Sequence, residues 1–458
     1  MRLSEIATVV HAKNDVSNWS NIEVNSFQFD SRLIKSGGFF IPLSGNDDGH
    51  KYIKKAYEMG ALASFCQPDK LNLVPDNFPI VVVDDPLKAF QTLASFWVKK
   101  VNPKVIAITG SNGKTTTKDI VASILKNNYR VHETQSSFNN EIGVPFTILS
   151  MPEDTEYLVL EMGMDRAGQL DELSNIAHPD IAVITMIGEA HIEFFKTRDR
   201  IADAKMEITN HLSNNGTFIF NGDEPLLLKR ANKFANEYTF GHINDNYISA
   251  KNIHLDYQNY ITTFQTNLTD NNVFKLPLMG TYNVDNALPG ILIGLLAGIK
   301  VEDIKSKLNN LSLTKNRTEL LKGQKGETIL SDVYNSNPTA VIDVLNVFSN
   351  MQTNGKRIVV LGDMLELGDD AVALHSNLSN YLNPQSIDEV YLIGIYIKNL
   401  SDILKEKFDP EKIHYYLNDN LDSLANSLKD SITGDDLILL KASHGLHLEK
   451  ILANLIGD

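Results

Sequence analysis

The feature of this sequence that most constrains its fold is an apolar run that ends in a glycine-rich turn and continues as a helical pattern. Residues 105–109 have strong strand character, and apolar residues recur at helical spacing from 120 to 125. The turn between them therefore lies where a strand ends and a helix begins. At such a junction the backbone N–H groups and the positive end of the helix dipole favour a bound anion.

The residues of this turn match a phosphate-binding loop better than an ordinary strand-to-helix connection. Two glycines let the backbone curl around a phosphate, Lys114 can reach the terminal phosphates, and the Thr115 hydroxyl can bind Mg²⁺. Ile108 replaces the first glycine of the common pattern G-x-x-x-x-G-K-[ST], so the loop is a shortened variant. We predict a nucleotide triphosphate site formed by Gly110, Ser111, Asn112, Gly113, Lys114, Thr115 and Thr116.

Length and composition limit the remaining possibilities. At 458 residues the chain is long enough for about three domains. A single cysteine, Cys66, excludes an internal disulfide framework, and no signal peptide or membrane span is seen, so we expect a cytoplasmic protein. The net charge of −15 argues against a general nucleic-acid binder, although small anionic substrates can still bind locally.

Alternation of apolar strands with helical patterns predicts an α/β fold with three domains. Residues 1–101 are expected to form a small α/β domain, and residues 102–312 a central P-loop-type domain with a mostly parallel sheet. A polar stretch at 244–272 is expected to form hairpins or loops. A second alternation predicts a Rossmann-like α/β domain over 313–458.

Four parts of the chain resemble the Mur ligase family of ATP-dependent amide-forming enzymes, and their order and spacing argue against chance. The first part is the phosphate loop. The others are Ser137–Pro145 with Glu161–Gly163, Ile187–Phe195 with Ala204–Ile208, and Gly280–Ala287. Together they cover nearly the whole chain, so the resemblance implies the family's fold and its ATP-dependent ligase chemistry.

The resemblance implies two Mg²⁺ ions beside the phosphate loop, held by Thr115, Glu161, His191 and Lys205. On its own, a glutamate or histidine after a strand end is commonly a surface or packed residue, and the family match favours metal contact. We expect Lys114, His191 and Lys205 to be catalytic.

Lys205 needs a separate argument, because a helical lysine usually covers apolar surface with its stem while its amine stays in water. It lies on the flank of the face formed by Ile201, Ala204, Ile208 and Leu212. In the family this lysine is carbamylated by CO₂ and helps to bind the second Mg²⁺. Partial burial would favour that reaction by lowering the pKa of the amine.

The resemblance also implies that ATP is bound from two domains. Asn283 and Asn286 match family positions around the adenine, and Arg317 and Asp332 match positions that contact the nucleotide from the C-terminal domain. Closure of the domains would assemble the site and exclude water from a reactive intermediate.

Further motifs point to the substrates. Phe29–Arg32, with segments that extend to His50, resembles the UDP-binding domain of the later Mur ligases, whereas an isolated Asp-Ser-Arg would be only a turn. Tyr334–Pro338 and Leu361–Gly368 match the family member that adds D-alanyl-D-alanine. The implied partners are UDP-N-acetylmuramoyl-tripeptide and D-alanyl-D-alanine, joined through an acyl phosphate. The implied substrate-binding residues are Ser31, Arg32, Asn139, Asn140, Asn335 and Asn337.

Two departures from the family pattern and several alternatives stay open at this point. Tyr282 replaces a usual histidine, and Lys441–His444 replaces the usual Lys-Gly-Ser-Arg. The nearest alternatives are the third-residue ligase, whose Asp-Asn-Pro motif is not seen, and a folylpolyglutamate synthase, against which the UDP-like segment argues. A nucleotide switch or a non-catalytic UDP-sugar sensor would not need this combination of substrate domain and metal residues.

Overall fold

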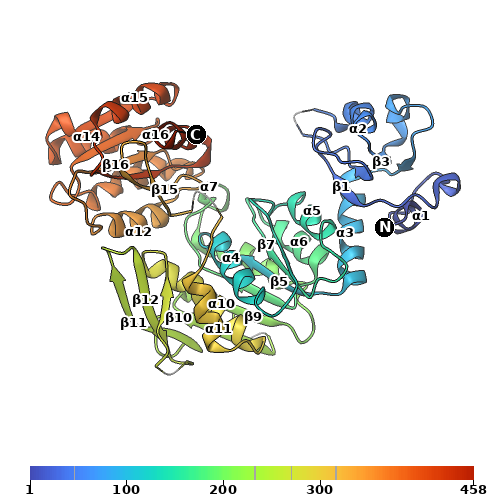
Figure 1. The fold of residues 1–458 in the computed structure, drawn as a ribbon, viewed down its shortest axis with the longest axis horizontal. Helices are drawn as coiled ribbons and strands as arrows, with labels where there is room; N and C mark the ends of the chain where they lie inside the picture. The colour runs from blue at the N-terminus through green and yellow to red at the C-terminus, as the bar shows by residue number, and fades with distance from the viewer. Residues whose placement is uncertain (46, 232–233, 270, 315–316, 458) are drawn as a thin grey trace. The chain divides into compact units, whose positions relative to one another are not determined.

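The computed structural model confirms an α/β fold with three sheets (Figure 1). The structure describes residues 1–45, 47–231, 234–269, 271–314 and 317–457. Positions 315 and 316, which belong to the predicted C-terminal domain 313–458, lie outside the described residues.

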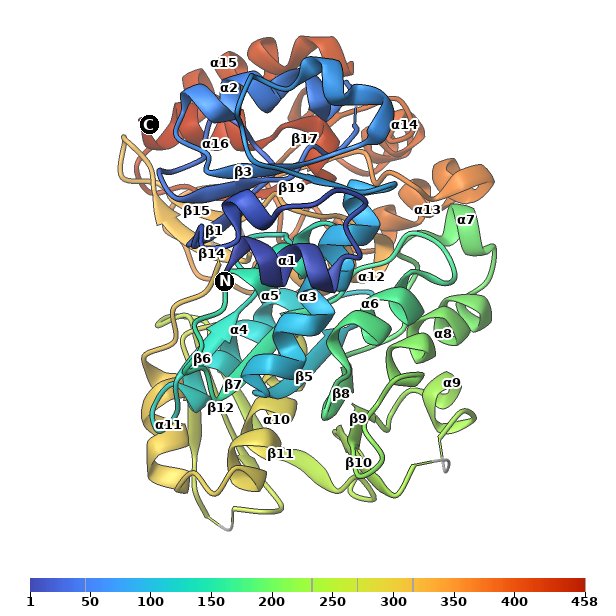
Figure 2. The same ribbon diagram turned by 90° about the vertical axis from the view of Figure 1, so that its right-hand side faces the viewer.

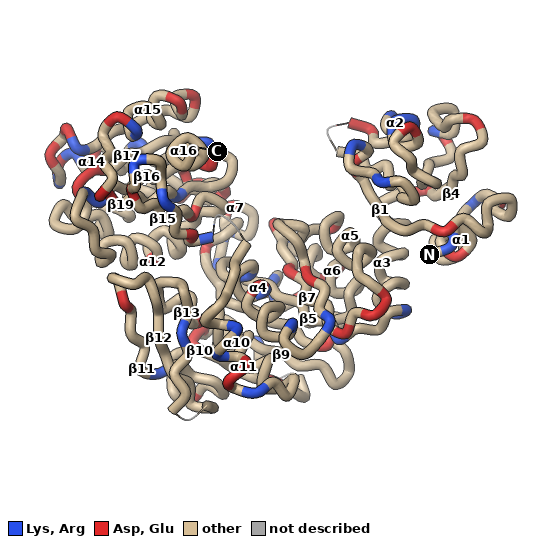
Figure 3. Tube along the Cα trace, viewed as in Figure 1, with Lys and Arg blue, Asp and Glu red and all other residues tan. Residues whose placement is uncertain are grey.

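Contacts along the chain divide it into two compact units. Unit 1 consists of Met1–Ile108, Asn128–Ala182 and Glu207–Phe218, and unit 2 consists of Thr109–Asn127, Val183–Met206 and Ile219–Asp458. Acidic and basic residues are interspersed along the trace of both units (Figure 3). None of the helices in the described ranges has the length and apolar character needed to cross a membrane.

Unit 1 contains a four-stranded parallel sheet in the order β1-β2-β3-β4. Its strands are β1 (Ser26–Gln28), β2 (Gly38–Phe40), β3 (Ala63–Cys66) and β4 (Ile80–Val82), and the helices of this segment are α1 (Leu3–Val9) and α2 (Ile53–Glu58). Strands β2, β3 and β4 are buried along their whole length, as is typical of parallel strands covered on both faces.

Helix α3 (Pro86–Val101) follows this sheet and packs on α5 (Gly143–Leu149) and α6 (Gln169–Ala177). The Asp85 carboxylate caps α3 by accepting backbone N–H groups of its first turn, and Pro86 occupies the position where a missing N–H is tolerated. Strand β7 (Tyr157–Glu161) pairs in parallel with β5 (Lys104–Thr109) and with β6 (Val131–Glu133).

These strands belong to a nine-stranded sheet with the order β13-β12-β11-β10-β9-β8-β5-β7-β6. Its other strands are β8 (Ile181–Ile184), β9 (Thr217–Asn221), β10 (Asn236–Gly241), β11 (Ile248–Asp256), β12 (Ile261–Thr266) and β13 (Phe274–Leu276). Strands β11 and β12 form an antiparallel pair, so the polar stretch at 244–272 contains a hairpin, as predicted.

In unit 2, helix α4 (Lys114–Leu125) begins at the phosphate loop and packs closely against α10 (Thr281–Leu296). Glycines on α10 make this approach possible. A Cβ atom at Gly290 would lie 2.6 Å from Ile120, and one at Gly294 would lie 2.8 Å from Ile124. Helix α11 (Val301–Asn309) follows α10 and also contacts α4. This packing fixes the helix whose N-terminus faces the predicted phosphates.

The rest of unit 2 contains a six-stranded sheet in the order β14-β15-β19-β16-β17-β18, antiparallel only at the β14–β15 pair. The strands are β14 (Glu319–Lys322), β15 (Thr328–Asp332), β16 (Arg357–Gly362), β17 (Glu389–Ile393), β18 (Ile413–Tyr416) and β19 (Leu437–Lys441). The helices are α12 (Pro338–Phe348), α13 (Ala371–Asn377), α14 (Lys398–Lys407), α15 (Leu421–Ser431) and α16 (Glu449–Ile456).

Helices cover both faces of this sheet, which makes it doubly wound as predicted. Apolar residues of α12, α13 and α14 pack in one core cluster, and those of α15 and α16 pack in the other. Both views show α12 and α15 on opposite sides of the strands (Figure 1, Figure 2). The parallel strands therefore direct their carboxyl ends, and the loops that follow them, toward one edge, where α/β proteins bind ligands.

Candidate active site

The phosphate loop connects β5 with α4, as the sequence predicts. Gly113 has a left-handed backbone (φ 81°), and an added Cβ would lie 2.0 Å from Asn286 Oδ1. A Cβ at Gly110 would lie 1.8 Å from Thr185 Oγ1. Both positions therefore require glycine, because neighbouring side chains occupy the space of any larger residue. Lys114 Nζ donates a hydrogen bond to the Gly110 carbonyl at 2.8 Å, so its ammonium folds back over the loop.

Side chains from neighbouring segments hold this loop in place. The Ser111 hydroxyl accepts a hydrogen bond from the Gly188 N–H at 2.9 Å, and the Thr185 hydroxyl donates to the Asn112 carbonyl at 2.5 Å. The amides of Asn112 and Asn337 exchange two hydrogen bonds, at 3.2 and 2.6 Å. Thr185 had no signal in the sequence, because a threonine after a strand is common in any α/β protein.

Lys205 lies on α8 (Arg198–Met206) and is almost fully buried, with 2% of its surface exposed. Burial, together with the charge of Lys114, holds the pKa of the Lys205 amine well below its ordinary value. Lys205 is therefore more deeply buried than the partial burial that the sequence predicted. The predicted apolar face was also too long: α8 ends at Met206, and Ile208 lies in a separate 3₁₀ turn. A lowered pKa increases the share of neutral amine, which is the nucleophilic form that carbamylation requires.

His191 is placed by an unusual backbone. It has a left-handed conformation (φ 63°) and immediately precedes α7 (Ile192–Phe195). Its Nδ1 lies 2.5 Å from Glu366 Oε2. Glu366 was part of a sequence motif that we connected with the acceptor substrate, so sequence reasoning missed its contact with the histidine.

Glu161 ends β7 in unit 1 and is buried, with 1% exposed. Its carboxylate accepts a hydrogen bond from Asn139 Nδ2 at 2.8 Å, and its N–H donates to Thr134 Oγ1 at 3.0 Å. Asn139 therefore orients the predicted metal ligand. Asn140 instead accepts hydrogen bonds from the Ile142 and Gly143 N–H groups, which orders the turn that leads into α5.

Asn283 and Asn286 lie on the first turns of α10. The Asn283 amide donates to the Met279 carbonyl at 2.8 Å, and the Asn286 amide donates to Asn283 Oδ1 at 3.3 Å. Sequence reasoning missed a neighbouring ion pair, His242 with Asp285, at 2.7 Å. The hydrogen bond that His242 donates to the Asp285 carboxylate raises the pKa of His242, whereas burial raises the pKa of Asp285.

Arg317 lies beside a cavity of about 280 Å³ in unit 2, which is lined by Met279, Leu311–Thr314 and Arg317–Leu320 among others. Its guanidinium lies 3.8 Å from the centre of the Tyr334 ring, and that ring stacks on His444 with centroids 5.7 Å apart. Planar stacking of this kind suits a guanidinium over an aromatic face. His444, one of the two departures from the family pattern, is thus part of a stack that begins at Arg317.

Asp332 is paired with buried Lys441, whose Nζ lies 2.5 Å from Asp332 Oδ2 and donates to the Asn335 carbonyl at 2.9 Å. The Asn335 side chain accepts the Ser336 N–H at 2.8 Å, and Asn337 Oδ1 accepts the Ala340 N–H as the cap of α12. These two asparagines already have protein partners, so their first role is to shape the segment at the end of β15.

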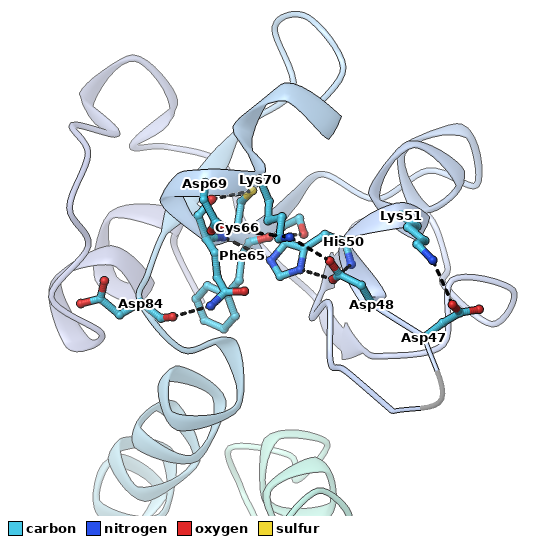
Figure 4. Close-up of polar contacts among 11 residues, drawn as sticks. Asp47, Asp48, His50, Lys51, Phe65, Cys66, Asp69, Lys70 and Asp84 are labelled. Atoms are coloured by element: carbon cyan, nitrogen blue, oxygen red, sulfur yellow. Dashed lines mark hydrogen bonds and ion pairs between the residues drawn. The ribbon is translucent and has the colours of Figure 1, made fainter.

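In unit 1, Ser31 is buried, and exposed Arg32 pairs with Asp30 at 2.7 Å. Residues 48–50, at the end of the segments that resemble the UDP-binding domain, are held together by hydrogen bonds of the buried His50 side chain (Figure 4). His50 Nδ1 lies 2.7 Å from Asp48 Oδ1, and its Nε2 accepts the Gln67 N–H at 3.2 Å. The hydrogen bond from His50 lowers the pKa of Asp48 to about 2, and burial raises the pKa of nearby Cys66 to about 11.

Comparison with protein-family models supplies the class of protein. Residues 108–294 match the Mur ligase middle domain, and residues 316–444 match the Mur ligase, glutamate ligase domain. The chain belongs to the Mur ligase family.

Relatives that match over nearly the whole chain carry a more specific name than the family models do. The chain is 37% identical over 455 residues to the UDP-N-acetylmuramoyl-tripeptide--D-alanyl-D-alanine ligase of Bacillus subtilis, covering 99% of this chain and 98% of the relative. It is 32% identical over 452 residues to the ligase of the same name from Rickettsia prowazekii, covering 96% of each.

Solved structures agree with this similarity. One crystal structure of MurF from Acinetobacter baumannii matches with a TM-score of 0.86 at 26% identity, covering 100% of this chain and 99% of that one. MurF ligase from Thermotoga maritima in complex with ADP matches with a TM-score of 0.79 at 28% identity, covering 95% and 97%.

Proposed function

We propose that this protein is an ATP-dependent ligase that joins D-alanyl-D-alanine to UDP-N-acetylmuramoyl-tripeptide, giving the pentapeptide precursor of peptidoglycan, ADP and phosphate. The full-length similarity to ligases of that name supports the reaction. The observation that carries the proposal within the structure is the pairing of a glycine-dependent phosphate loop with a buried lysine. Lys205 and Lys114 lie in the same unit, and the charge of Lys114 adds to burial in lowering the pKa of the Lys205 amine.

Three parts of the chain would divide this task. Residues 1–101 would bind the UDP-linked substrate through the segment that contains Ser31 and Arg32. Residues 102–312 would bind ATP, and residues 313–458 would contribute nucleotide and acceptor contacts. The long similarity to dipeptide-adding ligases supports this division, since it includes all three ranges.

The reaction would proceed through an acyl phosphate. The terminal carboxylate of the tripeptide attacks the γ-phosphorus of ATP, and the bond to the ADP oxygen breaks. The amine of D-alanyl-D-alanine then attacks the acyl carbon and loses a proton, and phosphate leaves with the C–O bonding electrons. Lys114 and the loop N–H groups would neutralise charge on the moving phosphoryl group, which is the main requirement of phosphoryl transfer.

The side chains fit the Mg²⁺ that such chemistry needs. Thr115 and Glu161 offer hard oxygen atoms, and His191 offers an imidazole whose second nitrogen is already bound to a carboxylate. In the described part of the chain no three His, Cys, Asp or Glu side chains gather as a metal cage. Mg²⁺ is usually held by one or two carboxylates together with substrate phosphates. When bound, it would offset negative charge on the phosphates.

Carbamylation of Lys205 would complete this donor set. The neutral amine attacks CO₂, the N–C bond forms, and one proton is released to solvent, so that a buried neutral amine becomes a carbamate anion with two oxygen atoms. The lowered pKa of Lys205 supports this proposal, because an ammonium cannot react with CO₂.

A steady-state assay of phosphate release tests the function. The expected result is release that requires ATP, UDP-N-acetylmuramoyl-tripeptide and D-alanyl-D-alanine together. Release with free lysine or diaminopimelate in place of the dipeptide would assign the chain to the preceding ligation step.

A further inference from the structure

Glu366 and His191 come from segments far apart in the sequence and meet side chain to side chain. Glu366 follows β16, within unit 2, and His191 precedes α7 in the same unit. The two side chains lie 2.5 Å apart, and the Glu193 N–H also donates to the Glu366 carbonyl at 3.1 Å. A Cβ at Gly368 would lie 3.3 Å from Glu193, so the turn at 366–368 fits tightly on α7. The contact is therefore made at several points.

Both residues of this pair have backbones that non-glycine residues rarely adopt. His191 and Glu366 each have φ 63°, in the left-handed region. A side chain larger than glycine is disfavoured there, and such conformations persist where the surroundings impose them, commonly at functional sites. Two strained residues in direct contact indicate that the orientation of the two side chains is what the local structure maintains.

The chemistry of the contact decides which nitrogen of the histidine is available. An ionised carboxylate only accepts hydrogen bonds, so the N–H donor of this contact is Nδ1. Nε2 then presents its lone pair. Histidines that bind metals usually have this arrangement, in which a carboxylate on one nitrogen fixes the ring and the tautomer for the other.

We infer that Glu366 is the positioning residue that turns His191 Nε2 toward the metal, so that the metal site is complete only while the 366–368 turn is docked on α7. This inference rests on the proposed function, in which His191 binds Mg²⁺. It also gives the segment Leu361–Gly368 a role distinct from acceptor selection, because Glu366 reaches the metal side of the site from the C-terminal sheet.

With Mn²⁺ in place of Mg²⁺, spectroscopy shows directly whether a histidine nitrogen binds the metal. In the full-length protein with Mn²⁺ and a non-hydrolysable ATP analogue, electron spin echo spectra should show a coordinated imidazole nitrogen. Glu366→Ala should lose this signal and bind Mn²⁺ about 10–100-fold more weakly. Glu366→Gln keeps an acceptor oxygen, so it should retain part of the nitrogen signal and part of the Mn²⁺ affinity. The affinity for UDP-N-acetylmuramoyl-tripeptide should stay unchanged and serves as the control for folding.

Two matched variants make the outcomes separable. Glu193→Ala removes a neighbouring carboxylate but keeps the backbone hydrogen bond, and it should behave as wild type. His191→Ala should abolish the nitrogen signal. If Glu366→Ala keeps the wild-type signal and affinity, the positioning role is wrong while the metal site stands. If wild type and His191→Ala give the same spectrum, the proposed metal role of His191 fails, and the inference fails with it.

Discussion

Lys205 gives the prediction that can be worked out furthest, through the pH dependence of stability. Its folded-state pKa lies well below the ordinary value because the amine is buried and Lys114 is near. Between the folded pKa and the unfolded value of about 10.5, the unfolded chain carries one more proton than the folded chain. The free energy of unfolding therefore rises with pH in that window, by up to ~1.4 kcal/mol per pH unit.

Replacement by methionine removes this proton difference while it keeps an apolar stem of similar length. In buffers freed of CO₂, Lys205→Met should be more stable than wild type near pH 7, and the gap should shrink as the pH rises. Urea unfolding, followed at several pH values, measures the slope. Bicarbonate should stabilise wild type alone, since CO₂ reacts only with the folded amine. Parallel pH profiles for the two proteins would refute the reasoning.

Three further perturbations test other contacts. Lys114→Ala should lower kcat by about 10²–10³-fold without loss of folding, and near-normal turnover in phosphate-release assays would exclude its role at the phosphoryl group. Asp363→Ala should lower the free energy of unfolding, measured in urea, by about 3 kcal/mol or more, because the Asp363 carboxylate accepts hydrogen bonds from the backbone N–H groups of residues 395–397. A decrease below about 1 kcal/mol would contradict that account. Asn112→Ala and Asn337→Ala should both raise the KM for ATP, because each removes the amide pair beside the phosphate loop. Asn337→Ala should also lower the free energy of unfolding by about 1 kcal/mol, because it loses the cap of α12. Unchanged KM values would show that the amide pair does not position the loop.

The strand-and-glycine pattern predicted the phosphate loop because its determinants are local. Glycines at Gly110 and Gly113 are required by atoms within a few ångströms, and the strand and helix on either side follow from hydrophobic periodicity alone. The doubly wound C-terminal sheet could be predicted for the same reason, since its central strands are short, fully buried apolar runs.

Contacts between distant segments could not be predicted in this way. Nothing in the sequence near Glu366 indicates that its carboxylate meets His191, and the pairing of Asn112 with Asn337 spans 225 residues. The degree of burial of Lys205 was underestimated because helical periodicity places a residue on a face but does not say what covers that face.

Phosphate release measured with each substrate omitted in turn tests the central claim most directly. The account predicts release only when ATP, UDP-N-acetylmuramoyl-tripeptide and D-alanyl-D-alanine are all present, with one phosphate released for each pentapeptide formed. Release that does not depend on the dipeptide, or amide formation with a single amino acid at a comparable rate, would contradict it.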